Sequence, residues 1–265
     1  MSTYLKAFVL FFIVGLTLLD ASLALAQNFP TLTTVHAFNG SDGAIPTSPV
    51  LLDTYLLGIT SAGNCIAVRS GNNGFGYGVA YQNNKDGSDS SGVAFSFTGD
   101  GAIPRASLVE DNAGNFYGTT MFGGLSGNLS GTGTIFKVAS NGNLSTLYSF
   151  SSLDSNGDNT DGAYPAVALI LGTGGNLYGT TSQGGQYGSG TIYKLSYDTI
   201  NKIWNLTTLY SFSALGSNGL NVDGANPFSP LVQDSNGNFY GTTRAGGQNG
   251  NGTIFGIYIL SLHGA

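Results

Sequence analysis

The sequence predicts an all-β protein, specifically a closed β-propeller of four blades with four antiparallel strands each. One motif, Asn-Phe-Tyr-Gly-Thr-Thr, occupies residues 115–120 and 238–243, and a close copy occupies 176–181. A second motif, Asp-Gly-Ala-x-Pro, begins at Asp42, Asp100, Asp161 and Asp223. The resulting period of about sixty residues is long for most solenoids but near that of kelch-type propeller blades. We therefore expect four copies of one blade.

The composition favours turn-rich β structure. The chain has 265 residues, of which 42 are glycines, and only 8% of all residues are charged. Because 41% of the residues are hydrophobic, the chain can bury a core, and the glycines do not indicate a disordered linker. The formal net charge of -6 argues against binding to a phosphate backbone, which requires clustered Lys and Arg. No nucleic-acid partner is expected.

Each repeat is predicted to form two hairpins. In the second repeat the predicted strands are 106–111, 115–120, 134–138 and 144–150. Asn112-Ala113-Gly114 separates the first pair and Asn141-Gly142 the last pair, and Asn and Gly favour tight turns. A Gly-rich segment joins the two hairpins. The first repeat is a degenerate copy, with matching strands at 56–60, 76–81 and 92–97.

The two ends of the chain predict how the propeller closes. The last repeat ends with its third strand, 253–260, whereas 31–38 resembles the fourth strand 206–212 and precedes the first Asp-Gly-Ala motif. The two segments together complete one blade, and a ring closed in this way has no exposed sheet edge. The alternative arrangement is a dimer that pairs two four-blade arcs.

The first 26 residues have the features of a secretory signal peptide. Lys6 precedes an apolar run, 7–19, and Ala24-Leu25-Ala26 supplies the small residues of a cleavage site. The propeller domain is then 27–265, and the mature protein is expected to be secreted or extracellular, without a membrane span. An uncleaved anchor is the alternative.

The repeated strings also resemble a known family. Leu-Tyr-Ser-Phe, Asp-Gly-Ala-x-Pro, Gly-Asn-x-Tyr-Gly-Thr-Thr and Gly-Thr-Ile-Phe-Lys, taken together, are similar to the GloVer (Gloeo/Verruco) tandem repeat of exported bacterial proteins. The resemblance implies an exported, propeller-like repeat protein that is often surface-associated. It implies no established catalytic activity, and no functional residue is carried over from it.

Few residues suit catalysis. The only cysteine is Cys65, and the only histidines are His36 and His263, which disfavours a nucleophile–base pair and a structural zinc site. Paired Asp residues could still serve glycoside hydrolysis. However, the repeated Asp42, Asp100, Asp161 and Asp223 have a structural explanation, since Asp-Gly initiates turns.

A loop in the third repeat raises a question about metal binding. Asp154, Asp158 and Asp161 place acidic oxygens at intervals along the loop, as in a calcium site. The loop lacks the Gly and the closing Glu of an EF-hand, and the fourth repeat has Gly216 and Leu220 at the first two positions. We expect no cofactor, and calcium at this loop is the alternative.

A binding face is expected on one rim of the propeller. In a four-stranded blade, the Gly-rich loop and the loop between blades emerge on the same side, and function often resides on long loops. Residues there that differ between repeats are Met121, Phe122, Gln183, Tyr187, Arg244 and Gln248. The predicted function is a non-enzymatic interaction or structural module for a protein or glycan at the cell exterior. The alternatives are a glycan-binding module, which requires exposed Phe122 and Tyr187, and a carbohydrate-active enzyme, which requires two Asp residues in one cleft.

Overall fold

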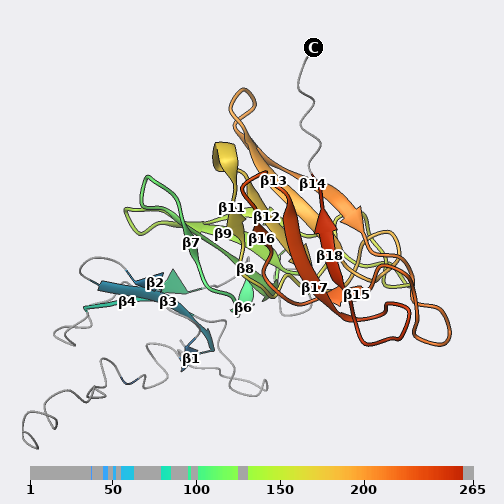
Figure 1. Ribbon diagram of the computed structural model, residues 1–265. Coiled ribbons are helices and arrows are strands. Elements are labelled where there is room, and N and C mark those ends of the chain that lie inside the picture. Colours follow the sequence, from blue (N-terminus) through green and yellow to red (C-terminus); the bar gives the residue numbers. More distant parts are fainter. Residues whose placement is uncertain are drawn as a thin grey trace, which may run out of the picture. The chain divides into compact units, whose positions relative to one another are not determined.

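The computed structural model describes residues 37, 44–46, 50–51, 55–62, 79–84, 95–96, 101–124 and 131–258 (Figure 1). The predicted signal peptide, most of the predicted N-terminal strand 31–38, and Cys65 lie outside the described residues. The strands form four antiparallel sheets, each drawn from one repeat. The all-β prediction is therefore confirmed. A closed ring is not observed among the described residues.

The second and third repeats each form a complete blade. The second contains β6 (Ala102–Pro104), β7 (Val109–Glu110), β8 (Phe116–Phe122), β9 (Thr134–Val138) and β10 (Leu144–Ser149). The third contains β11 (Ile170–Leu171), the 3-10 turn η1 (Thr173–Gly175), β12 (Leu177–Thr181), β13 (Thr191–Asp198) and β14 (Ile203–Ser211). In the second repeat β7 pairs with β8 and β9 with β10, and in the third β11 pairs with β12 and β13 with β14, so the two predicted hairpins are confirmed.

The first and fourth repeats follow the same plan. The first contains β1 (Ala44–Pro46), β2 (Val50–Leu51), β3 (Tyr55–Ala62), β4 (Val79–Asn84) and β5 (Phe95–Ser96). The fourth contains β15 (Ala225–Pro227), β16 (Val232–Gln233), β17 (Phe239–Ala245) and β18 (Ile254–Ile257). Within the described part of the chain, no strand pairs with the outer edge of β18.

The first strand of each blade differs from the prediction. One strand was expected at 106–111, but β6 pairs with the second half of β8 and the shorter β7 with its first half. The interruption follows the Asp-Gly-Ala-x-Pro motif, whose variable residue has a positive φ of 56° at Ile103. The same conformation occurs at Ile45, Tyr164 and Asn226. Because a β-branched residue rarely adopts it, the surrounding contacts must impose this conformation.

Hydrogen bonds at the tight turn explain the Asn and Tyr of the six-residue motif. The Asn115 amide and the Tyr117 hydroxyl both donate to Asp111 Oδ2, each at 2.8 Å. Asn238 donates likewise to Asp234 at 2.9 Å. Desolvation raises the pKa of Asp111, but hydrogen bonds from Asn115 and Tyr117 outweigh it, so the pKa lies below its usual value. The ionised carboxylate therefore holds the hairpin together.

A pair of buried threonines explains the end of the same motif. The hydroxyls of Thr120 and Thr134 lie 2.7 Å apart, and the equivalent pairs are Thr181–Thr191 at 2.8 Å and Thr243–Thr253 at 2.9 Å. The glycine of Asp-Gly-Ala lies against this pair. A Cβ atom on Gly101 would be 2.8 Å from Thr120 Cγ2, which only glycine avoids. The two motifs recur together because they contact each other.

Neighbouring repeats pack through apolar side chains. One face of the third blade, including Leu177 and Tyr193, packs against Phe150 of the second repeat. Its other face, including Ile192, packs against Phe239 of the fourth repeat. The Phe150 and Tyr193 rings meet edge to face at 5.4 Å, and Phe212 and Phe255 repeat this contact at 5.2 Å. Packing of sheet on sheet, with the same ring contact at successive joints, is the arrangement of propeller blades.

Candidate functional site

The loop between the second and third blades is fixed by a carboxylate. Asp161 accepts hydrogen bonds from the Tyr148 hydroxyl at 2.8 Å, from the Ser151 backbone N–H at 2.9 Å, and from the Ser151 hydroxyl. The fourth repeat reproduces all three bonds with Asp223, Tyr210 and Ser213. Asp161 and Asp223 are therefore structural, as predicted, whereas Asp42 and Asp100 lie outside the described residues. Their role differs from the expected turn initiation, because each fastens the loop to the outer strand of the preceding blade.

This arrangement changes the ionisation of both partners. Burial raises the pKa of Asp223, but hydrogen bonds from Ser213 and Tyr210 outweigh it, so the pKa lies below its usual value. Donation to Asp223, with some desolvation, raises the pKa of Tyr210 to about 12. The proton thus stays on the phenol and the carboxylate stays ionised.

An asparagine joins the two long loops of the third repeat. Asn159 Oδ1 accepts bonds from the backbone N–H groups of Gly162 and Gly185, each at 2.8 Å, and Nδ2 donates to the Ser151 carbonyl at 2.9 Å. Asn221 makes the equivalent bonds in the fourth repeat, to Gly224, Gly247 and Ser213. The two loops therefore meet on one side, as expected. We call this surface the long-loop rim, comprising 151–163 and 182–190 in the third repeat and 213–225 and 244–252 in the fourth.

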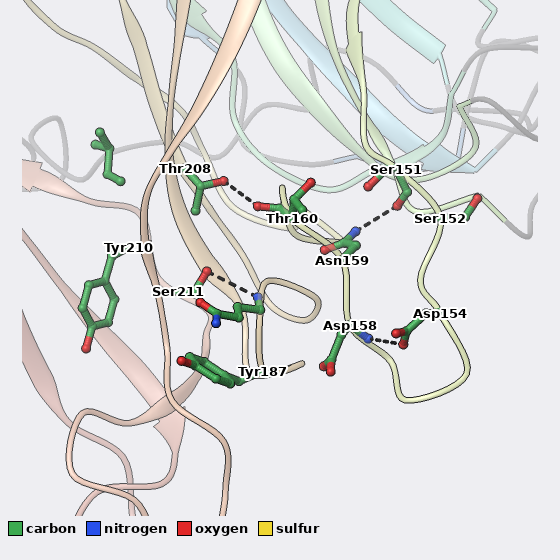
Figure 2. Close-up of a pocket in the computed structure, with 12 residues that line it drawn as sticks. Ser151, Ser152, Asp154, Asp158, Asn159, Thr160, Tyr187, Thr208, Tyr210 and Ser211 are labelled. Carbon is green, nitrogen blue, oxygen red and sulfur yellow. Dashed lines mark hydrogen bonds between the residues drawn. The ribbon is translucent and has the colours of Figure 1, made fainter.

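The long-loop rim contains a cavity of about 1060 Å³ in the third repeat (Figure 2). Its lining includes both loops and the edge of β14. Polar and aromatic side chains dominate it: Ser152, Asp154, Asp158, Gln186, Tyr187 and Tyr210. Two contacts hold the wall in place, since Thr208 Oγ1 donates to the Thr160 carbonyl at 2.9 Å and the Gln186 backbone N–H donates to Ser211 Oγ at 3.4 Å. The cavity is thus formed by segments that are tied to one another.

The structure brings only one of the six predicted rim residues into this cavity. Tyr187 lines it and is 46% exposed. Phe122 is only half-buried, and its ring contacts the Tyr164 ring at 5.4 Å. The remaining four lie elsewhere: Met121 is half-buried, and the exposed residues are Gln183, Arg244 and Gln248.

The predicted calcium ligands do not converge. Asp161 is occupied by Tyr148 and Ser151 and does not line the cavity, whereas Asp154 and Asp158 do. Backbone N–H groups of Asp158 and Asn156 donate to Asp154 and lower its pKa. Within the described ranges, no three His, Cys, Asp or Glu side chains are grouped so as to hold a metal ion.

Sequence reasoning considered Asp154 and Asp158 only for calcium and overlooked Gln186 altogether. Gln186 occupies the position of Gln248 in the fourth repeat, so it does not differ between these two repeats. The sequence already showed that Asp154 and Asp158 are replaced in the fourth repeat, but it gave no sign that they share a cavity with Tyr187.

In the part of the chain that the structure describes, no helix has the length and apolarity needed to cross a membrane. No curated protein matches the sequence.

Three solved structures resemble the chain at low identity. A luciferin-regenerating enzyme matches with a TM-score of 0.43 and 12% identity, over 81% of this chain and 62% of its own. A gluconolactonase from Xanthomonas campestris matches at 0.39 and 15%, over 76% and 55%. An alpha-L-arabinofuranosidase from Clostridium thermocellum matches at 0.41 and 10%, over 80% and 66%. The chain therefore spans between 55% and 66% of the length of these proteins.

The repeat signature itself identifies the family. The Gloeobacter/Verrucomicrobia repeat matches residues 61–261, which include all three copies of the six-residue motif. This confirms the resemblance drawn from the repeated strings. The protein belongs to the Gloeobacter/Verrucomicrobia repeat family.

Proposed function

We propose that the chain forms a closed four-bladed propeller outside the cytoplasm and acts there as a non-enzymatic module that binds a partner through the long-loop rim. The observation that carries this proposal is that some loop side chains make bonds that recur between repeats, whereas others are exposed and differ between repeats. Asp161, Asp223, Asn159 and Asn221 make the same bonds in successive repeats and serve the fold. The exposed, non-recurring residues of the long-loop rim are then available to a partner.

Closure of the ring is supported by an apolar surface on the fourth blade. Ile254 is 85% exposed, whereas its counterparts Ile135 and Ile192 are 0% and 1% exposed. A cavity of about 310 Å³ lies beside it, lined by Phe212 and Ile257 among others. In the third blade the matching Ile192 packs with Phe212, just after β14, and with Leu231 and Phe239 of the fourth repeat. Among the described strands, none occupies the outer-strand position beside β18.

We assign that position to residues 31–38. Leu32-Thr33-Thr34 repeats Leu206-Thr207-Thr208, and Phe38 matches Phe212. In the third blade Lys194 pairs with Thr207, and in the second blade Lys137 pairs with Ser145 at the same point. Transferring this register to the fourth blade pairs Thr33 with Gly256.

A disulfide tests closure directly. Thr33→Cys and Gly256→Cys, in a Cys65→Ser background, should form an intramolecular disulfide, because facing residues on paired strands have Cβ atoms about 4.5–5.5 Å apart. The control pairs Thr33→Cys with Val232→Cys, on β16 at the opposite edge of the sheet, and should not cross-link. A cross-linked monomer on a non-reducing gel is the expected product. A cross-linked dimer would indicate two paired arcs, and no cross-link would remove the clasp.

Binding through the long-loop rim is tested with envelope fractions from the source organism. The triple variant Gln183→Ala, Arg244→Ala and Gln248→Ala should lose capture by the envelope, because it removes exposed side chains from the proposed binding face. A variant of the opposite rim, Asn141→Ala with Asn236→Ala, serves as the control and should retain it. Equal capture of both variants would contradict the proposed face.

Export and the absence of catalysis are tested separately. Mass spectrometry of the secreted chain should show Gln27 as the first residue. Purified protein should release no sugar from a panel of aryl glycosides. Release that disappears in Asp158→Asn would instead support the carbohydrate-active alternative, since Asp154 and Asp158 line one cavity.

A further inference from the structure

The cavity of the third repeat combines residues that the repeat does not require. Asn159 lines it and recurs as Asn221, where it serves the fold. Asp154, Asp158 and Tyr187 also line it, but the fourth repeat has Gly216, Leu220 and Asn249 in their places. Side chains needed for folding recur along a repeat array, whereas those needed for a ligand can occur once. The three non-recurring residues converge on one cavity.

Their polar groups are not used within the described structure. The carboxylate of Asp158 accepts no hydrogen bond from any described residue, and neither the Tyr187 hydroxyl nor the Gln186 side-chain amide makes one there. Asp158 nevertheless lies beside the Gly-rich loop, because its Oδ1 is 3.1 Å from the position a Cβ would take on Gly188. Figure 2 draws Tyr187, Asp154 and Asp158 in the lower half of the view, among the residues that line the cavity. An aromatic ring, carboxylates and an amide are thus presented together.

This combination matches the chemistry of a sugar. A tyrosine ring offers an apolar surface for the C–H face of a pyranose and keeps a polar edge. A carboxylate accepts hydrogen bonds from hydroxyl groups, and a side-chain amide both donates and accepts them. Hydrogen bonds to a charged acceptor are the stronger ones. The volume of about 1060 Å³ is at the upper end of the roughly 300–1,000 Å³ typical of ligand pockets, so more than one sugar unit fits.

The charge of the cavity selects among sugars. Its lining contains two carboxylates and no Lys or Arg. Sulfated sugars and uronic acids would bring like charges close to these carboxylates, which is unfavourable. We infer that this cavity binds a neutral oligosaccharide, with Tyr187 as the stacking surface and Asp158 and Gln186 as hydrogen-bonding groups. The inference deepens the proposed function by naming the partner class.

The test uses the full mature chain on an array of neutral hexose and N-acetylhexosamine oligosaccharides, beside sulfated and uronic-acid ones. The best neutral hit is then titrated by calorimetry. Tyr187→Ala should weaken binding by about tenfold or more, since loss of a stacked ring corresponds to roughly 1.4 kcal/mol, and Tyr187→Phe should retain binding. Asp158→Asn should weaken it by a smaller factor.

Two controls exclude general effects of mutation. Tyr197 is also 46% exposed but lies outside the cavity, so Tyr197→Ala should bind as the wild type does. Val232 is 63% exposed on the opposite edge strand and also lies outside the cavity, so Val232→Ala should likewise have no effect. Titration with calcium chloride alone, and of the sugar in chelator, shows whether the carboxylates act through a metal ion instead.

The outcomes separate this inference from the proposed function. Neutral binding that depends on Tyr187 supports it. A silent neutral array, a preference for acidic sugars, or a Tyr187→Ala variant that binds normally would overturn it. If envelope capture still depends on Gln183, Arg244 and Gln248 while the array is silent, only the saccharide inference fails. Loss of both results would overturn the proposed function as well.

Discussion

The third and fourth blades carry the same sequence pattern but bury it differently. Ile192 and Leu195 of β13 are 1% and 0% exposed, whereas the matching Ile254 of β18 is 85% exposed and Ile257 is only half-buried. The third blade is covered on both faces by its neighbours. An apolar side chain on a blade is therefore buried only where an adjacent blade packs against it.

The contacts between successive blades recur, whereas the loop residues above them differ. At both joints the Asp–Tyr–Ser bonds and the edge-to-face rings recur. The loops above them differ, with Asp154 and Asp158 at one joint and Gly216 and Leu220 at the other. The scaffold thus repeats while the surface above it varies.

The largest effect is expected where a motif glycine contacts the threonine pair. Gly162 has a φ of 97°, and a Cβ there would overlap Thr181 and Thr191. Gly162→Ala should lower the free energy of unfolding by about 3 kcal/mol or more, measured by urea denaturation. Gly157 also has a positive φ, 85°, but has no atom within 4 Å of its Cβ position. Gly157→Ala should cost only about 1 kcal/mol, and equal losses would show that the contact with the threonines is unimportant.

A pair of isoleucine variants sharpens the comparison of the two blades. Ile192→Ala should cost about 3 kcal/mol because the side chain is fully buried. If the ring closes as proposed, so that a neighbouring blade covers β18 as the fourth blade covers β13, Ile254→Ala should cost a similar amount in the mature chain. A cost below about 0.5 kcal/mol, as for an exposed side chain, would mean that the face of β18 stays open.

The smallest effect concerns pH at the joint of Asp223 and Tyr210. Because the pKa of Tyr210 is raised from 10.0 to about 12, its stabilising contribution is present below pH 10 and is lost as the pH rises toward 12. Because the pKa of Asp223 is lowered from 3.8, its contribution is present above that value and is lost as the pH falls below it. Tyr210→Phe should flatten the alkaline loss of melting temperature, and Asp223→Asn should flatten the acidic loss. Unchanged profiles would show that this joint does not control either transition.

The fold class and the strands of each blade follow from the sequence because they rest on local rules. Alternating apolar residues predict strands, and Asn, Asp and Gly predict the turns between them; β8 to β10 lie close to the predicted ranges. The interrupted first strand could not be predicted, because the positive φ of Ile103 conflicts with its local preference.

The candidate site was predicted only in part. Variation between repeats pointed to Tyr187 and to the side of the blades where it lies. Its place beside Asp158 and Gln186 depends on bonds that Asn159 makes across 26 residues of sequence, to Gly185. No periodicity encodes such a contact.

By itself, the sequence determined the repeat, its strands and its turns, since each copy carries the residues that its own hydrogen bonds require. Only the tertiary structure decided which apolar faces are buried, why Asp161 and Asp223 recur, and which loop residues share a cavity. The physical reason is the separation in sequence of the contacts involved. A strand or a turn is stabilised by neighbours a few residues away, whereas burial and cavities arise where separate repeats meet.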